Sequence, residues 1–294
     1  MIIFCTGNIN KDNFNSIVLD IIKINNSYEN TIYFDNKLNN TKLDKNIHDN
    51  YCSIIDFDFD LVICIGGDGA FLSIVREMDK KQIPIIGIHI GNLGFLNQAN
   101  KNNFVEILND IFSRFPSVEY SEYHLIEAKV YNNSSLNEGT KLIALNDIVI
   151  KHADLLRLIK LDINLNKKFL NSYACDGIIF SSPIGSTAYS LSAGGPIVLH
   201  DINSLIITPI SPHSLSARPI IIDDQKIIQV SFPDHNDKIN IVSDGQVQKV
   251  VDSSSIVEIK KSKLKAKFVI SDLMESYFSK LKNKIGFSVP NSKK

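Results

Sequence analysis

The sequence predicts an α/β N-terminal domain with a parallel sheet, followed by a β-rich, sandwich-like C-terminal domain. Three observations lead to this prediction. The 294 residues exceed one ordinary domain and suit two. In the first third, continuous apolar runs alternate with segments of helical spacing. Beyond about residue 120, short runs of alternating polarity replace them.

The apolar runs of the first third have the length of strands that are buried on both faces. They are Ile2–Cys5, Leu61–Ile65 and Ile83–Ile90. Helical spacing marks Phe14–Ile24, Phe71–Met78 and Phe104–Phe115. Because strands and helices alternate, we expect a parallel sheet in a domain covering residues 1–121.

The second region, residues 122–270, reads as a series of short antiparallel strands. Arg157–Leu165 alternates apolar and polar residues, and Asn166–Lys168 suits a hairpin turn into a strand from Phe169. Further strands are predicted at Ser204–Thr208, Lys226–Phe232, Lys238–Ser243 and Ile256–Lys260. The tail, residues 271–294, is expected to form a helix from Ser271 that returns to the first domain.

Composition excludes several classes of protein. The net charge of -1 gives no general attraction to nucleic acid or to an anionic membrane. Neither a signal peptide nor an apolar stretch long enough to span a membrane is recognisable, so we expect a cytoplasmic protein. The four cysteines lack C-x-x-C spacing, which favours buried reduced thiols over disulfides or zinc. No histidine pair has i, i+4 spacing, and no metal-ligating residue is predicted.

The segment Gly66-Gly67-Asp68-Gly69 follows a predicted buried strand and precedes a helix. Ligands bind at the carboxyl ends of parallel strands, and glycines there let the backbone approach a phosphate. A carboxylate among them can act as a general base or position a metal ion. A tight turn capped by Asp68 explains the segment equally well.

A second glycine-bordered loop, Gly91–Leu96, also follows a buried strand. Phe95 in this loop could flank a base or a ribose. A structural turn with Phe95 in the core is the favoured interpretation of these residues alone.

Asn146 and Asp147 are adjacent polar residues inside the apolar run Ile143–Ile150. Burying polar groups without hydrogen-bond partners costs free energy, so two polar residues in an apolar run require a structural or functional explanation. An amide beside a carboxylate suits ribose hydroxyls, which both donate and accept hydrogen bonds. A β-bulge or a strand end is an equally good explanation.

The segment from Asp176 to Gly195 is the richest in small polar residues. A strand is expected to end at Ser181–Pro183, and Gly185-Ser186-Thr187 to open a short helix that Gly194-Gly195 closes. We favour a ligand-binding loop over a capped connector helix. Downstream, the polar stretches Pro212–Pro219 and Ser243–Gln246 read as loops between strands.

Taken together in this order, these motifs resemble the NAD kinase family of the bacterial type. Gly66–Gly69 is shared with diacylglycerol-type lipid kinases and phosphofructokinases, whereas Gly185–Tyr189 after a strand is much more specific. The sequence departs from the family pattern locally. Ala70 replaces a threonine, Asp147 a glutamate, and Ser182 and Ile184 two threonines.

The resemblance implies ATP-dependent phosphorylation of the 2′-hydroxyl of the adenosine ribose of NAD. Asp68 would be the catalytic base and would contact NAD. The other implied NAD contacts are Gly69, Phe95, Asn146, Asp147, Arg157, Ala174, Asp176, Thr187, Ala188, Tyr189, Ser190, Leu191, Ser192 and Gln246. Ala174 stands where some members carry a bulky basic residue associated with a preference for NAD, so use of NADH stays open.

The resemblance also implies Mg²⁺ or another divalent metal with ATP, and a homo-oligomer, either a dimer or a tetramer. Two alternatives remain at this point: a diacylglycerol-type lipid kinase and a non-catalytic NAD(P)-binding regulator. The first does not explain Gly185–Tyr189, and the second has no use for a base at Asp68.

Overall fold

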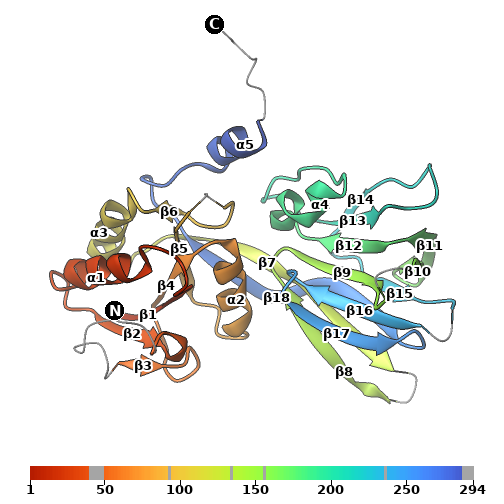
Figure 1. The fold of residues 1–294 in the computed structure, drawn as a ribbon, viewed down its shortest axis with the longest axis horizontal. Helices are drawn as coiled ribbons and strands as arrows, with labels where there is room; N and C mark the ends of the chain where they lie inside the picture. The colour runs from red at the N-terminus through yellow and green to blue at the C-terminus, as the bar shows by residue number, and fades with distance from the viewer. Residues whose placement is uncertain (40–49, 92–93, 133–134, 155–156, 235–236, 287–294) are drawn as a thin grey trace, which may run out of the picture. The chain divides into compact units, whose positions relative to one another are not determined.

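The computed structural model describes residues 1–39, 50–91, 94–132, 135–154, 157–234 and 237–286. The chain forms two compact units. One comprises Met1–Glu122 and Ala266–Lys294, and the other comprises Tyr123–Lys265. The chain leaves the first unit along β7 (Tyr120–Asn132) and returns along β18 (Ile256–Val269), as Figure 1 shows.

A parallel sheet forms the centre of the first unit. Its strand order is β3, β2, β1, β4, β5 and the end of β18, with β6 also paired to β5. The bounds are β1 (Ile2–Gly7), β2 (Thr31–Asp35), β3 (Tyr51–Cys52), β4 (Leu61–Gly66), β5 (Pro84–His89) and β6 (Ala99–Asn100). The predicted strands β1, β4 and β5 are confirmed, because their apolar runs are buried on both faces.

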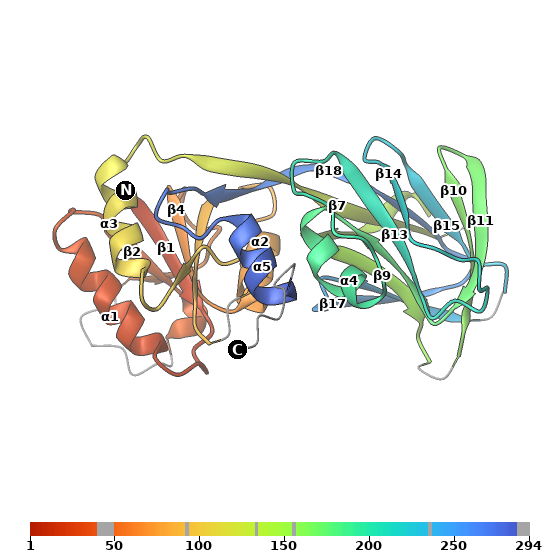
Figure 2. The same ribbon diagram turned by 90° about the horizontal axis from the view of Figure 1, so that it is seen from above.

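Helices cover both faces of this sheet. α1 (Phe14–Asn25) and α3 (Phe104–Arg114) pack on one face, where their apolar stripes join the first hydrophobic core. α2 (Asp68–Glu77) packs against β4 and β1 on the other face, as Figures 1 and 2 show. The predicted start of this helix at Phe71 is wrong by three residues, because Asp68 and Gly69 already belong to its first turn.

Two mainly antiparallel sheets enclose the core of the second unit. One has the order β14, β13, β12, β9, β16 and β17; the other includes β11, β10, β15 and β18, with β7 and β8 beyond. The bounds are β8 (Ser135–Ala144), β9 (Asp147–His152), β10 (Ile159–Leu165), β11 (Lys168–Cys175), β12 (Gly177–Ser181), β13 (Ser204–Ile210), β14 (Ile220–Asp223), β15 (Ile228–Ser231), β16 (Lys238–Ser243) and β17 (Val247–Asp252). The predicted sandwich-like arrangement is confirmed, with β16 correct to the residue.

Three further local predictions are wrong in their bounds or in the type of helix. The tail helix α5 spans Tyr277–Ile285 and does not begin at Ser271. The Ser276 hydroxyl accepts a hydrogen bond from Ser279 N–H and caps the helix at this point. The strand predicted at Ile256–Lys260 continues to Val269, since its lysines alternate with buried residues. The single helix expected after Gly185 is a 3₁₀ turn (η3, Ile184–Thr187) followed by one α-helical turn (α4, Tyr189–Ser192).

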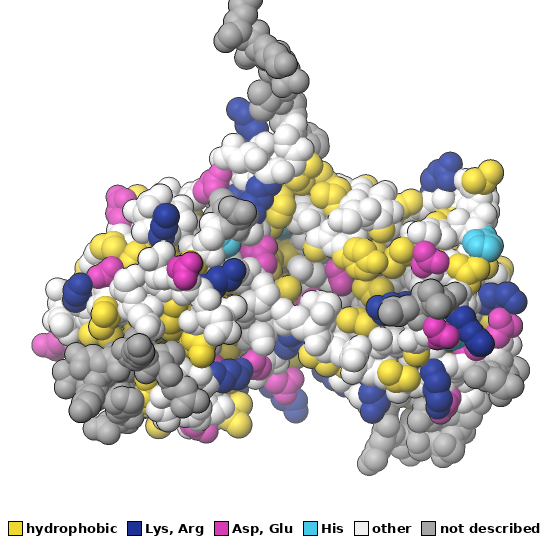
Figure 3. Space-filling model, viewed as in Figure 1, with side chains coloured by type: hydrophobic (Ala, Val, Ile, Leu, Met, Phe, Trp, Pro, Cys, Tyr) yellow, Lys and Arg dark blue, Asp and Glu magenta, His cyan; other side chains and the backbone are white. Residues whose placement is uncertain are grey.

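The four cysteines are free and buried, as the sequence predicts. Burial raises the pKa of the Cys5 thiol to about 12, so this thiol stays protonated and unreactive at neutral pH. Within the described part of the chain, no helix has both the length and the apolar composition needed to cross a membrane. Figure 3 shows acidic and basic side chains interspersed over the visible face, with no large area of one sign.

Candidate functional site

The turn Gly66–Gly69 joins the carboxyl end of β4 to the start of α2. Gly67 is the N-cap residue, and Asp68 is the first residue of the helix. An acidic group in the first turn is favoured by the partial positive charge of the helix N-terminus. The half-buried Asp68 side chain is therefore presented at the sheet edge where ligands of parallel sheets bind.

Three donors hold the Asp68 carboxylate, all from the loop that follows β5. Phe95 N–H donates to Oδ2 at 2.8 Å. Leu96 N–H and the Asn97 side-chain amide donate to Oδ1 at 3.3 and 2.9 Å. The two glycine-bordered segments that the sequence singled out separately therefore meet at one carboxylate, whose orientation is fixed.

Gly94 makes this close approach possible. A Cβ atom at this position would lie 1.7 Å from Asp68 Oδ1. No side chain fits there unless the carboxylate or the loop moves, so glycine is required for the observed geometry. Phe95, predicted as a possible ligand contact, is half-buried in this loop.

His89, at the end of β5, is a residue that the sequence did not suggest. It is 5% exposed, and neither ring nitrogen has a well-formed hydrogen bond among the described residues. Burial lowers the pKa of His89, and the nearby Gly91 backbone and Asp68 carboxylate partly offset this effect. Burial therefore favours the uncharged form of the His89 ring, near the Asp68 carboxylate.

In the second unit, Asp147 is the first residue of β9, and Asn146 directly precedes it. The strand-end interpretation of this pair is thus correct, and it does not exclude a ligand role. Asp147 is 4% exposed, and no donor from the described residues reaches its carboxylate. The Asn146 side-chain amide is also without a partner in this part of the chain, although its backbone groups are used.

Asp244 organises this corner of the unit. Its carboxylate accepts hydrogen bonds from the backbone N–H groups of Leu145, Asn146 and Asp147, at 3.1, 2.8 and 3.3 Å. Its own N–H donates to the Asp147 carbonyl at 3.0 Å. Burial, and secondly the Asp244 charge, raise the pKa of Asp147 to about 7.

Ser182 connects the Asp176–Gly195 segment to the same corner. Its hydroxyl donates to Leu145 O at 2.6 Å and accepts from Gly185 N–H at 3.1 Å. A Cβ atom on Gly185 would lie 2.1 Å from Asn146 O. Ser182 thus keeps the hydroxyl chemistry of the threonine that the resemblance leads one to expect at this position.

The segment Thr187–Ser192, predicted to contact NAD, follows directly in η3 and α4. Ser190 is buried and its hydroxyl pairs with Thr208, so it supports the backbone. Tyr189 is 47% exposed, and Ser192 is also exposed; Thr187, Ala188 and Leu191 are half-buried. Tyr189 is therefore free to stack on a ligand, whereas Ser190 is not.

Three other predicted residues lie at the opposite end of β12. Asp176 directly precedes Gly177, which pairs with Lys151 and Ile210, whereas Ser181 at the far end pairs with Asp147. Ala174 is near the end of β11, and its carbonyl accepts from His213 N–H at 2.9 Å. Arg157 is exposed near Asp154 and Asp237, beyond the end of β9. The predicted residues of this unit thus form two groups at opposite ends of one strand.

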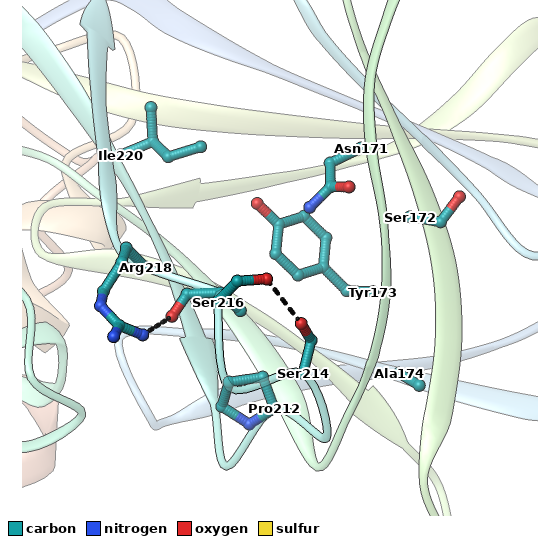
Figure 4. A pocket seen from close by; sticks show the side chains of 10 residues that line it. Asn171, Ser172, Tyr173, Ala174, Pro212, Ser214, Ser216, Arg218 and Ile220 are labelled. Atoms are coloured by element: carbon teal, nitrogen blue, oxygen red, sulfur yellow. Dashed lines mark hydrogen bonds between the residues drawn. The ribbon is translucent and has the colours of Figure 1, made fainter.

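A hollow of about 250 Å³ lies beside Ala174. Figure 4 shows Tyr173 on β11 facing Ser214, Ser216 and Arg218 of the loop after β13. The Arg218 guanidinium donates to the carbonyls of Leu215 and Ala217 at 2.7 and 2.8 Å, so it braces its own loop. Gln246, the last predicted contact, is exposed in the turn after β16, next to Asp244.

These arrangements support different chemistry in each unit. In the first, an oriented carboxylate in a glycine-rich turn can accept a proton from a hydroxyl. In the second, an amide and an acid without side-chain partners among the described residues can bind hydroxyl groups. Among the described residues, no group of three or more His, Cys, Asp or Glu side chains could hold a metal ion.

From the residues alone the sequence predicts the Asp244 segment as a turn, with Gln246 as an NAD contact implied by the resemblance. It does not predict the contacts of Asp244 and Ser182 with the Leu145–Asp147 segment, or the burial of His89. Asp244 acts on a loop almost one hundred positions away, which no local pattern reveals. The one available signal was an aspartate directly before a glycine at a strand end.

Comparison with known proteins bears on both units. Residues 11–115 match the model of the ATP-NAD kinase N-terminal domain, and residues 145–271 match that of the C-terminal domain. An NAD kinase from Syntrophotalea carbinolica is 33% identical over 228 residues, which cover 78% of this chain and 78% of that protein.

Two solved structures share the fold. A yeast NADH kinase complexed with NADH has a TM-score of 0.87 and 24% identity, covering 100% of this chain and 90% of the yeast chain. An NAD kinase from Archaeoglobus fulgidus in complex with ATP has a TM-score of 0.74 and 23% identity, covering 97% and 98%. Because both domain models and relatives matched over most of their length agree, the chain belongs to the NAD kinase family.

Proposed function

We propose that Asp68 is the general base in the reaction of this family member, the ATP-dependent phosphorylation of NAD at the 2′-hydroxyl of its adenosine ribose. The supporting observation is the carboxylate at the end of β4, held by three donors in a glycine-rich turn. A ribose hydroxyl is a poor nucleophile at neutral pH, and transfer requires it in line with the γ-phosphate. An oriented carboxylate can take up the proton as the new bond to phosphorus forms.

Asn146 and Asp147 supply the ribose contacts in this proposal. Both side chains lack partners among the described residues, while Asp244 and Ser182 fix the backbone beneath them. Ribose hydroxyls would satisfy the amide and the acid together. Tyr189, which is exposed, provides a ring for the base, and Thr187, Ala188, Leu191 and Ser192 complete the contacts with NAD.

Arg157, Ala174 and Asp176 form a separate group, together with the hollow beside Tyr173. We assign this group to the NAD bound by a neighbouring copy in a homo-oligomer. The support is that these residues lie at the end of β12 opposite to Asp147 and Ser181. Gln246, next to Asp244, belongs with the Asn146 group.

A divalent cation, Mg²⁺ or a similar metal, enters with ATP in this proposal. The described side chains offer no three-ligand cluster, which fits a cation held mainly by phosphate oxygens. Bound there, it would neutralise charge on the phosphates. The protein is expected to act in the cytoplasm, where NAD and ATP are available.

The direct test is an assay with NAD, ATP and Mg²⁺, in which the product is identified by phosphorus NMR. We expect NADP, phosphorylated at the 2′-position of the adenosine ribose. The proposal is wrong if NAD binds but no NADP forms, or if an alcohol in a diacylglycerol preparation accepts the phosphate instead.

A further inference from the structure

The C-terminal helix α5 contacts the short segment that holds Asp68. Lys280 Nζ donates to the main-chain oxygen of Asn97 at 2.6 Å and to that of Phe95 at 3.4 Å. The N–H of Phe95 and the side chain of Asn97 donate in turn to the Asp68 carboxylate. Lys280 therefore binds the acceptor groups of the same segment whose donors orient Asp68. Figures 1 and 2 show α5 beside the segment between β5 and β6.

The placement of Lys280 is unusual for a surface helix. Its side chain is only 6% exposed, and burial lowers the pKa of its amino group. Burying an ammonium group is costly unless it gains partners. Here the partners are the two carbonyls, and the nearby charges of Glu275 and Asp68 partly offset the effect of burial on the pKa. A leucine would anchor the helix at lower cost, so the choice of lysine needs another reason.

Lys284 adds a second contact from the same helix. Its Nζ lies 4.7 Å from the centre of the Phe95 ring, a favourable cation–π distance. The two lysines, one turn apart, thus hold the segment from its carbonyl side and over its aromatic side chain. The matched family models end at residues 115 and 271, so neither includes α5.

We propose that Lys280 is a positioning residue for phosphoryl transfer: it holds Phe95 and Asn97 where their donors fix the Asp68 carboxylate. This inference rests on the proposed role of Asp68 as base. It assigns to α5 a part in catalysis that goes beyond anchoring the tail. A loss of this contact leaves NAD contacts in the second unit unchanged, so turnover and not substrate affinity should respond.

The test uses the full-length protein with Lys280→Met, Lys280→Arg and, as matched control, Lys282→Met, which removes an exposed charge from the same helix. We expect Lys280→Met to lower kcat by about tenfold to a hundredfold, because small misplacements of reacting groups are costly. KM for NAD should change by less than about twofold, and the arginine should restore most of kcat. Lys282→Met should have no effect. If the methionine variant does not fold, Lys280→Gln is measured in its place.

A double-mutant cycle separates positioning from a general structural role. In an Asp68→Asn background, Lys280→Met should lower kcat no further, because the group that it positions is already lost. Equal losses in both backgrounds, or a Lys282→Met effect as large as that of Lys280→Met, would overturn the inference. Full turnover in Asp68→Asn alone would instead refute the proposed base, and an unimpaired Lys280→Met beside an impaired Asp68→Asn would refute only the role of Lys280.

Discussion

Asp68 and Asp147 are the same residue type in two contrasting environments. Asp68 is half-buried and receives three hydrogen bonds. Asp147 is almost fully buried, receives none from the described residues, and has a neighbouring carboxylate that helps to raise its pKa to about 7. Environments of this kind separate the roles of two acids in one enzyme. The first suits an oriented base, and the second suits a group that is neutral for part of the physiological pH range.

The environment of Asp68 depends most strongly on the loop that donates hydrogen bonds to its carboxylate. Replacing Gly94 with alanine places a Cβ atom 1.7 Å from Asp68 Oδ1, so the carboxylate or the loop must move and the three hydrogen bonds to Asp68 are disturbed. We expect kcat to fall by about a hundredfold with NAD affinity retained. Steady-state kinetics and calorimetry measure the two quantities, and unchanged kcat in a folded protein would contradict the described geometry.

The environment of Asp147 is tested by a substitution of its neighbour Asn146. Asn146→Ala removes an amide that lacks a partner in the described chain, so stability should change little. We expect NAD affinity to fall by about tenfold, the value of one good hydrogen bond. Calorimetric titration with NAD provides the measurement. Unchanged affinity would remove Asn146 from the ribose site and leave Asp147 as its remaining candidate.

The raised pKa of Asp147 predicts a smaller effect on stability. The folded state binds the proton of the Asp147 carboxyl group more tightly than the unfolded chain does. The free energy of unfolding that this difference contributes is therefore complete below the unfolded pKa, near 3.8. It is lost as pH rises towards about 7. Asp147→Asn stays neutral throughout and avoids this loss. We therefore expect the melting temperature of the variant, relative to the parent, to be higher by a few degrees at pH 8 than at pH 5.

Thermal unfolding of the parent and of Asp147→Asn, both with Asp244 intact, at pH 5 and pH 8 tests this prediction. A difference between variant and parent that is independent of pH would mean that Asp147 is ionised in the folded protein at both pH values. The contrast with Asp68 would then rest on hydrogen bonding alone.

Much of the fold could be predicted because the decisive signals are local. The apolar run of β4 and the alternation of β10 reflect burial on two faces and on one face. The turn at Asn166 and Lys167, both with positive φ, is the hairpin expected there. The tail was harder, because Leu273 continues the apolar stripe although the Ser276 cap starts the helix later.

The candidate site was foreseen in its parts and less well in its arrangement. Local motifs identified Asp68 and the loop containing Phe95, but only the fold brings them within hydrogen-bonding distance. Asp244 and Lys280 act on segments 97 or more positions away, so spacing could not reveal them. The same holds for Asp176, which belongs to a continuous motif yet lies at the far end of β12 from Ser181.

The central claim is that Asp68 acts on the reacting hydroxyl and not on NAD binding. The most direct measurement is therefore kcat together with the dissociation constant for NAD in Asp68→Asn, with Asp58→Asn, an exposed aspartate, as control. The account predicts that Asp68→Asn lowers kcat by roughly two to four orders of magnitude while the dissociation constant stays within about threefold of that of the parent. Near-normal kcat in a folded Asp68→Asn protein would contradict it.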